Sequence, residues 1–352
     1  MPVSIVVGGQ YGSEGKGKVV ALLSQLHSEP WVVRCGGPNS GHTTCVAGRD
    51  VVLRQLPAAA GQIGAKLFLS AGCVVSEDLL INEIVACHLS PNQVTVDPRA
   101  VLVTPTDVEA EQALSDSIGS TASGTGSALA RRMLRGKHVQ LAGDSERLRQ
   151  YVQVKLVAEL LHRHIDLGGQ VIVEGTQGFG LSLLHGAGYP FVTSRDTTAA
   201  GFAMEVGLSP RQIDDIVMVI RTYPIRVSGN SGELSDEITW DIIRERSGAP
   251  TVELEYTSVT NRVRRVGEFN LSLVRQAVLY NRPTSIALMG LDRLDFRNRG
   301  ITDQADCSDH AVTFLNKLES QLRLPIRWVG SGFQTAEAID RSPQHHYSTI
   351  NE

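Results

Sequence analysis

A glycine-rich loop near the N-terminus constrains this chain more than any other feature. Residues 8–18 read Gly-Gly-Gln-Tyr-Gly-Ser-Glu-Gly-Lys-Gly-Lys and follow the apolar run 3–7. Glycines let backbone N–H groups approach an anion closely, and the N-terminus of a following helix adds its dipole. Lys16 and Lys18 add positive charge. The pattern therefore predicts a strand, a phosphate-binding loop and a helix.

The loop departs from the Walker A pattern at one position. The spacing Gly12-x4-Gly17-Lys18 matches, but Val19 stands where P-loop enzymes place a hydroxyl on Mg²⁺. A glycine turn without a ligand is the alternative interpretation. Two lysines among five glycines favour the phosphate loop.

Composition limits the class of protein. With 352 residues, 42% of them hydrophobic, the chain can bury a large core, and we expect a single domain over residues 1–352 with loop insertions. A net charge of −4 argues against a protein that coats nucleic acid. Five cysteines without a Cys-x-x-Cys motif suit free thiols in a reducing cytosol. No run reaches the ~18 apolar residues of a membrane span, so we expect a cytoplasmic protein (host cytoplasm if viral) that binds no membrane.

Short β-branched runs alternate with helical patterns along the chain. We expect strands at 3–7, 31–34, 101–104, 171–174, 216–220, 285–289 and 326–329, and helices at 16–27, 77–88, 107–116, 146–164, 271–280 and 309–322. Such alternation predicts an α/β fold, with a central mostly parallel β-sheet flanked by helices. Ser76 and Ser145 are expected N-caps, and residues 51–53 the return strand of a hairpin.

The richest polar loops follow expected strand ends, where open α/β sheets bind ligands. They are residues 36–44, 118–126, 174–178 and 257–265. Each combines small residues with hydrogen-bond donors, which suits several phosphates better than one apolar ligand.

Together these segments resemble the adenylosuccinate synthetase family, nearly end to end. The first loop is similar to the family's Gly-Asp-Glu-Gly-Lys-Gly-Lys, and residues 39–43 to Asn-Ala-Gly-His-Thr. Residues 174–178 match Glu-Gly-Ala-Gln-Gly, and residues 189–194 match Tyr-Pro-Tyr-Val-Thr-Ser. The resemblance implies a P-loop-like fold and a ligase that forms a C–N bond in two steps. A nucleotide γ-phosphate moves to the 6-oxygen of a purine monophosphate, and the amine of L-aspartate then displaces it, with Mg²⁺ stabilising the charge.

The resemblance also assigns site residues. It implies catalytic roles for Ser13, His42 and Gln177, and Mg²⁺ contacts for Ser13 and Gly41. It places the nucleotide and its phosphates at Gly12, Glu14, Gly15, Lys16, Gly17, Lys18, Gly41, Thr43, Arg264, Asp292, Ser331 and Gly332. It places the purine monophosphate at Ser13, Asn39, Ser120, Thr121, Arg131, Gln177, Thr193 and Arg262. It places aspartate at Thr257, Ser258, Val259, Thr260, Arg262 and Arg264.

Some of these roles have simpler alternatives. His42 is expected to contact the migrating phosphoryl group, although a lone histidine is more often structural. The arginines of the 257–265 loop suit a carboxylate, although an exposed basic edge is the alternative. Arg131 resembles an arginine lent by a partner subunit, which implies a homodimer; the chain is shortened there, so Arg132 or Arg135 are alternatives.

Ser13 is the main departure from the family pattern. The family carries an aspartate there, which takes the proton from purine N1; a carboxylate with a reference pKa near ~3.9 can do so, and a serine hydroxyl cannot. Guanine carries an amino group on C2 beside N1, and a hydroxyl leaves room for it. The resemblance is therefore closest to the phage-type branch that joins aspartate to dGMP, leading to 2-aminoadenine (diaminopurine) DNA. Water, the substrate phosphate or Glu14 are the alternatives for removing the N1 proton.

Gly290 is the second departure. Residues 290–292 align with a Lys-Leu-Asp motif that recognises guanine in GTP, and the lysine is missing here. We therefore expect ATP or dATP as donor. The alternatives are an ordinary adenylosuccinate synthetase that uses IMP and GTP, or a non-catalytic nucleotide-binding paralogue. The arginines retained for aspartate argue against the paralogue.

Overall fold

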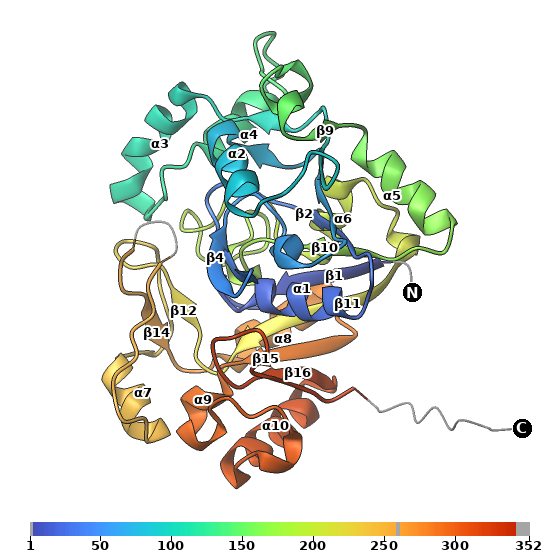
Figure 1. The fold of residues 1–352 in the computed structure, drawn as a ribbon. Helices are drawn as coiled ribbons and strands as arrows, with labels where there is room; N and C mark the ends of the chain where they lie inside the picture. Colours follow the sequence, from blue (N-terminus) through green and yellow to red (C-terminus); the bar gives the residue numbers. More distant parts are fainter. Residues whose placement is uncertain (1–2, 258–260, 343–352) are drawn as a thin grey trace, which may run out of the picture.

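A large, mostly parallel sheet forms the centre of the molecule (Figure 1). The computed structural model describes residues 3–257 and 261–342. Ten strands follow the order β17-β16-β15-β11-β1-β10-β2-β5-β7-β9. Among these described strands, β17 alone runs antiparallel to its neighbour. In sheet order they span Ala338–Asp340, Ile326–Gly330, Ser285–Met289, Ile213–Arg221, Val3–Gly8, Val171–Glu174, Trp31–Arg34, Lys66–Leu69, Val94–Val96 and Gln153–Val154.

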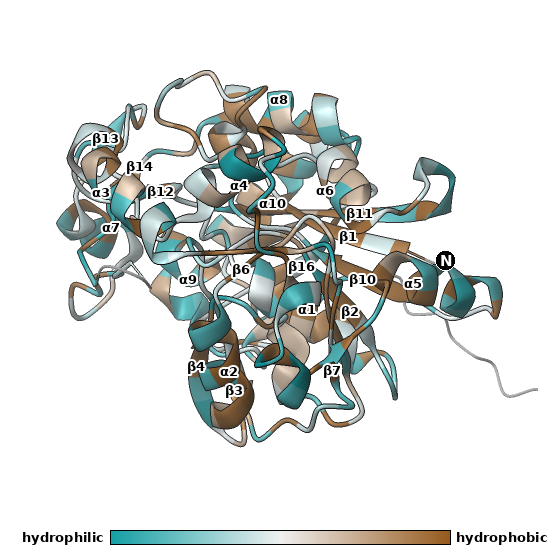
Figure 2. Cartoon of the chain, turned by 90° about the horizontal axis from the view of Figure 1, so that it is seen from above, coloured by the Kyte–Doolittle hydropathy of each residue, from teal (hydrophilic) through white to brown (hydrophobic). Residues whose placement is uncertain are grey.

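Helices cover both faces of the sheet, so its strands are apolar on both sides (Figure 2). Side chains of β1 alternate between the faces: Ile5 packs into one cluster and Val6 into the other. The first face carries α5 (Val157–Asp166), α6 (Ala199–Val206), α8 (Leu271–Asn281) and α10 (Asp309–Leu322). The second carries α1 (Lys16–Gln25) and α2 (Glu77–Ala86).

Smaller elements surround this core. The remaining helices are α3 (Pro105–Ile118), α4 (Thr125–Met133), α7 (Trp240–Ser247) and α9 (Leu291–Leu294). A three-stranded sheet joins β12 (Ile225–Arg226), β14 (Arg265–Gly267) and β13 (Glu237–Ile238). The pair β6 (Val74–Val75) and β8 (Val101–Leu102) is parallel. Within the described ranges, each helix is too short or too polar to span a bilayer.

Most expected elements are confirmed within a few residues. The hairpin is present as β3 (His42–Val46) and β4 (Arg49–Leu53), paired antiparallel. Ala47 and Gly48 form its turn, both with positive φ. Thr104 and Asp107 form a capping box that begins α3 two residues before the expected start.

The expected helix over 146–164 is wrong. The segment forms a 3₁₀ turn at Leu148–Gln150, then β9, and α5 begins only at Val157. The N-terminal amide of α5 is bound at 3.0 Å by Asp97, which lies 60 residues earlier in the chain. The Ser145 hydroxyl accepts from Leu148 N, the first residue of the 3₁₀ turn, at 3.0 Å, and it does not cap a long helix.

Two further strand expectations need correction. Residues 101–104 contribute β8, a two-residue strand outside the central sheet. The central strands β5 and β7 were not expected from the sequence. Ser76 stands at the N-cap of α2, but its side chain makes no capping hydrogen bond.

The topology brings distant loops to one edge. Strand β1 lies between β10 and β11, and these strands are parallel to β2, β15 and β16. The loops that follow the six strands therefore meet at the carboxyl edge of the sheet, beside the point where strand order reverses. This edge carries the candidate site.

Candidate active site

Two cavities lie at this edge, one of about 780 Å³ and one of about 180 Å³. The glycine loop contributes Tyr11 to the smaller cavity and Ser13 to the larger one. The next loop contributes Asn39 to the smaller cavity and Gly41 to the larger one. Because two loops each reach both cavities within two residues, a group bound in one lies next to a group bound in the other.

The expected site residues fall into two sets, according to the cavity that they line. The larger one is lined by the phosphate loop and by several other segments, and its lining includes Ser13, Glu14, Gly15, Lys16, Gly17, Lys18, Gly41, His42, Thr43, Thr257, Arg264, Asp292 and Gly332. The smaller one is lined by Asn39, Ser120, Thr121, Gln177 and Thr193. The sequence assigned the first set mainly to the nucleotide and the second to the purine monophosphate, so the structure keeps each set together.

Some expected residues line neither cavity. Gly12, Arg131, Arg262 and Ser331 are outside both linings. The Ser331 hydroxyl is buried and donates to Ile301 O at 2.6 Å. Arg262 is exposed. Ser258, Val259 and Thr260 lie outside the described residues.

The backbone of the phosphate loop needs glycine at close approaches. Gly15 precedes α1 with φ of 103°, a left-handed conformation that side chains rarely adopt. A Cβ on Gly17 would lie 2.9 Å from the Cβ of His42. The glycines thus let the loop pack directly on the strand that carries His42.

Glu14 organises this loop from inside. Its buried carboxylate accepts hydrogen bonds from Gly12 N at 2.8 Å, Gln10 N at 3.1 Å and Lys16 Nζ at 2.7 Å. Lys16 also donates to the carbonyl of Gln177, which joins the loop after β1 to the loop after β10. A carboxylate with these three donors is poorly placed to take a proton from a purine ring.

Lys18 connects α1 to the loop after β16. Its ammonium group donates to Gly332 O at 2.9 Å and to Glu337 O at 2.7 Å. Burial lowers the pKa of Lys18 to about 8. In this structure Lys18 therefore fixes one wall of the larger cavity.

His42 is buried and paired with Glu174, 132 residues away in the chain. The Nδ1 atom bonds one carboxylate oxygen of Glu174, and Ala58 N donates to the other at 2.7 Å. Burial, reinforced by the positive charge of Arg34, lowers the pKa of His42 to about 4 despite Glu174. The ring is therefore neutral at pH 7; because Glu174 accepts at Nδ1, we assign the proton to Nδ1, which leaves the lone pair on Nε2.

Ser13 is exposed at the larger cavity and has φ of 57°. Its carbonyl accepts from Arg221 Nη1 at 3.2 Å. Left-handed φ is several-fold more common for Asn and Asp than for most other non-glycine residues. The chain thus places serine in a backbone conformation that suits the aspartate of the resemblance better.

The loop over residues 257–265 carries a partly buried arginine beside the larger cavity. Arg264 donates from Nε to Tyr256 O at 3.1 Å, and burial lowers its pKa to about 10, so it stays cationic at neutral pH. Glu255 beside it forms ion pairs with Arg221 and Arg293. These partners were not expected from the sequence, although Arg221 directly follows an expected strand, a position that signals a ligand-facing loop.

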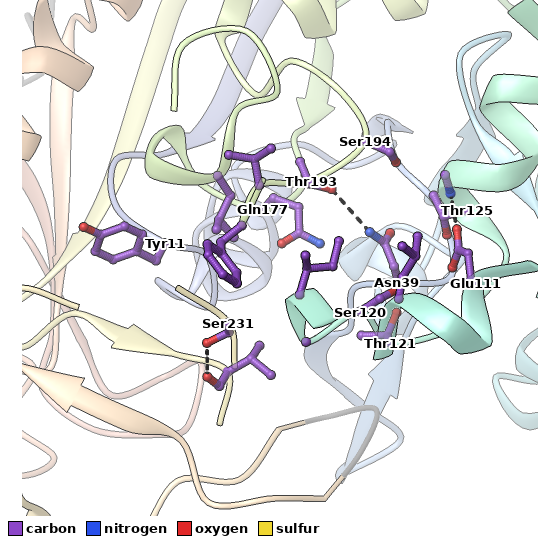
Figure 3. A pocket seen from close by; sticks show the side chains of 18 of the residues that line it. Tyr11, Asn39, Glu111, Ser120, Thr121, Thr125, Gln177, Thr193, Ser194 and Ser231 are labelled. Carbon is purple, nitrogen blue, oxygen red and sulfur yellow. Dashed lines mark hydrogen bonds between the residues drawn. The ribbon is translucent and has the colours of Figure 1, made fainter. Parts of the chain in front are cut away.

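Uncharged polar groups and apolar side chains make up most of the lining of the smaller cavity (Figure 3). Asn39 Nδ2 donates to Thr193 Oγ1 at 3.5 Å, and Gln177 points toward the same space. Glu111 and Arg226 also line it, and the sequence gave no signal for either. Glu111 accepts from Gly124 N at 2.8 Å and Ser127 N at 3.1 Å, and so caps α4.

Arg131 is held within its own chain. Its guanidinium contacts both carboxylate oxygens of Asp107, at 3.1 and 2.8 Å, and Leu102 O at 2.8 Å. Arg132 donates to Ala71 O at 2.7 Å. Arg135 is exposed, with positive φ.

Comparison with known proteins decides the family. The family model for adenylosuccinate synthetase matches residues 5–155 and 137–299. The adenylosuccinate synthetase of Thermococcus onnurineus is 37% identical over 350 residues, covering 97% of this chain and 99% of that protein. This chain belongs to the adenylosuccinate synthetase family. It is a C–N bond-forming ligase of the kind that binds a nucleotide and aspartate.

Two solved structures of the family share the fold. Fully ligated adenylosuccinate synthetase from Plasmodium falciparum has a TM-score of 0.85 at 19% identity, over 97% of this chain and 100% of that chain. The succinoaminodeoxyadenylate synthetase of cyanophage S-2L, bound to dGMP and dATP, has a TM-score of 0.81 at 26% identity. That match covers 96% of this chain and 95% of the phage protein. The α/β architecture expected from the sequence is confirmed.

The donor atoms at the junction of the cavities suit the Mg²⁺ on which synthetases of this family depend. The Ser13 hydroxyl and the Gly41 backbone both belong to residues that line the larger cavity, and both offer oxygen. Magnesium in nucleotide sites takes few protein oxygens and completes its shell with phosphates and water. The residues present therefore fit Mg²⁺ held mainly by the donor phosphates.

Proposed function

We propose that this synthetase joins L-aspartate to C6 of dGMP through a 6-phosphoryl intermediate, with ATP or dATP as donor. The product is 2-amino-2′-deoxy-N6-succinoadenylate, a precursor of 2-aminoadenine (diaminopurine) DNA in a bacteriophage. The observation that carries the proposal is Ser13, an exposed hydroxyl in a left-handed backbone position where the family pattern has aspartate.

Ser13 suits a guanine acceptor on steric and polar grounds. It lies two residues from Tyr11 of the smaller cavity, at the junction where the acceptor base would meet the donor phosphate. A hydroxyl is smaller than a carboxylate and can accept a hydrogen bond from the C2 amine of guanine. Since the backbone amides of Gln10 and Gly12 hold the Glu14 carboxylate inside the loop, water or the substrate phosphate is the better route for the N1 proton.

His42 would act on the phosphoryl group. Its Nε2 atom carries no proton at neutral pH while the site is without ligands. A bound triphosphate brings several negative charges next to the ring, which raises the pKa of the imidazole. The protonated ring, held by Glu174, then donates to oxygen as negative charge develops there in the transition state.

The substrate aspartate would bind at the side of the larger cavity formed by the 257–265 loop. Thr257 and the cationic Arg264 line that side. An arginine fork suits a carboxylate, and it directs the substrate amine toward the purine. Lys16 would move from Glu14 to the donor phosphates when these enter.

The loop at Gly290 favours a phosphate-donor nucleotide whose base is adenine. Gly290 has φ of 82°, and a Cβ there would lie 2.9 Å from Thr222 Oγ1, so the lysine of the guanine-binding motif has no ready place. The phage synthetase with 26% identity was solved with dGMP and dATP, which supports the same pair of ligands here.

The ordinary reaction, IMP with GTP, is the second candidate. The observation that favours it is the identity of 35–37% to archaeal adenylosuccinate synthetases over nearly the whole chain. That identity is higher than the 26% shared with the phage enzyme.

Phosphate release tests the proposal directly. The assay combines IMP, GMP or dGMP with ATP, dATP or GTP, each with and without aspartate and Mg²⁺. The proposal expects release that requires aspartate and is fastest with dGMP and an adenine donor. Faster turnover of IMP would establish the ordinary reaction, and release indifferent to aspartate would show hydrolysis of the donor without ligation and would contradict the proposal.

A further inference from the structure

The donor end of the larger cavity contains a network of two carboxylates and two arginines. Arg299 Nη1 lies 2.8 Å from Asp292 Oδ2 and 2.8 Å from Glu253 Oε2. Arg293 lies 3.0 Å from Glu253. All four residues line the cavity, and Asp292 is almost fully buried. The carboxylate expected to bind a base is therefore already paired.

The two possible donor bases present opposite patterns to such a pair. Guanine offers two donors side by side, N1–H and the C2 amine, which require a carboxylate free to accept both. Adenine offers one acceptor, N1, beside one donor, the C6 amine. An arginine N–H next to a carboxylate oxygen presents one donor beside one acceptor, which complements adenine and places donor against donor with guanine.

We propose that Arg299 sets the donor preference for adenine by occupying Asp292 and offering its own N–H to the base. The inference rests on the proposed function and names the residue that selects the donor nucleotide. Arg299 is one-third exposed, so its guanidinium is accessible from the cavity while Asp292 and Glu253 hold it in place. Removing it frees the Asp292 carboxylate for the two donors of guanine, while Glu253 keeps its ion pair with Arg293.

The test is the ratio of kcat/KM for GTP to that for ATP. Arg299→Met keeps the length of the stem and removes the donor group, and we expect the ratio to rise about tenfold or more, the size of one lost base-edge pair. Adding Asp292→Asn to Arg299→Met should abolish the gain with GTP, because guanine then loses its acceptor. Arg297→Gln is the matched control, since Arg297 is exposed, pairs with Asp295 and does not line the cavity.

Calorimetric binding of ATP and GTP without acceptor gives a second readout, independent of turnover. If Arg299→Met does not fold, Arg299→Lys keeps the charge but loses the fork, and it should raise the ratio by a smaller factor. An unchanged ratio in a folded Arg299 variant, or an equal shift in Arg297→Gln, overturns the inference. Failure of the proposed acceptor is read separately, from the dGMP and IMP rates of the wild-type protein.

Discussion

The two cavities differ in the number of charged side chains that line them. The larger one is lined by a dense set of charged groups, including Lys16, Lys18 and Arg264. Among the described residues, the smaller one is lined by two charged side chains, Glu111 and Arg226. The guanidinium of Arg226 is bound to the carbonyls of Ser231, Glu233 and Phe191. On the proposed function, the larger cavity offers several cations to a triphosphate, whereas the N–H groups of Arg226 in the smaller one are taken up by backbone carbonyls, so we expect a further cation for the monophosphate.

The missing cation suggests a partner subunit. An arginine from a second copy of the chain would neutralise the monophosphate, which agrees with the homodimer implied by the resemblance. The structure favours Arg135 for this role over Arg131, because Arg131 is bound to Asp107 and Leu102 in its own chain.

The largest expected effect is at His42, in the lining of the larger cavity. His42→Ala should lower kcat by about 10²- to 10⁴-fold, because its proton is used as the phosphoryl group moves. Donor affinity should change only a few-fold, since the phosphates bind mainly to the loop and the lysines. Steady-state rates and calorimetry on one preparation measure both; equal losses in rate and affinity would make His42 a binding residue.

The buried His42 also makes stability depend on pH. Its folded pKa of about 4 lies below the ordinary value of 6.5, so the unfolded chain binds the additional proton. The stabilisation is fully present above pH 6.5 and is lost as pH falls toward 4; it amounts to roughly 3 kcal/mol. Urea unfolding at pH 7.5 and 4.5 should show this loss, and His42→Gln should flatten it. A wild-type curve as flat as that of the variant would contradict a neutral buried ring.

Ser13→Asp tests the acceptor side of the comparison. We expect the ratio of kcat/KM for dGMP to that for IMP to fall about tenfold, because the carboxylate crowds the C2 amine. A charged hydrogen bond from that amine, worth about 1.5–3 kcal/mol, acts in the opposite direction. We expect crowding to dominate, since the left-handed backbone at Ser13 limits how the carboxylate can turn. Competition between dGMP and IMP measures this ratio, and Ser13→Ala is the control for a smaller, uncharged side chain.

Subunit mixing tests the origin of the missing cation and has the smallest expected effect. Verified heterodimers of Arg135→Leu and His42→Ala subunits should recover about half of the wild-type activity, because one of the two sites then has both residues. Arg131→Leu in place of Arg135→Leu should give no such recovery if Arg131 serves its own chain. Recovery with Arg131→Leu alone, when the Arg131→Leu homodimer is itself inactive, would return the role to Arg131.

The sequence by itself determined the elements whose signals are local. The apolar run before Gly8 and the lysines after Gly15 specify a strand, an anion loop and a helix, because glycine and helix N-termini act over a few residues. The motif around His42 and the loop at Gln177 were found in the same way, and the structure places them at one edge. The helix expected from residue 146 was wrong because its periodicity continued through a short strand.

Only the tertiary structure decided which distant groups meet. Asp97 begins α5 from 60 residues away, and Glu174 holds His42 from 132 residues away. Arg299 pairs with both Asp292 and Glu253, and the latter comes from a separate segment of the chain. These contacts depend on the order of strands in the sheet, and on burial, which makes an unpaired charge costly. The local periodicity of a sequence indicates neither the strand order nor which charges become buried.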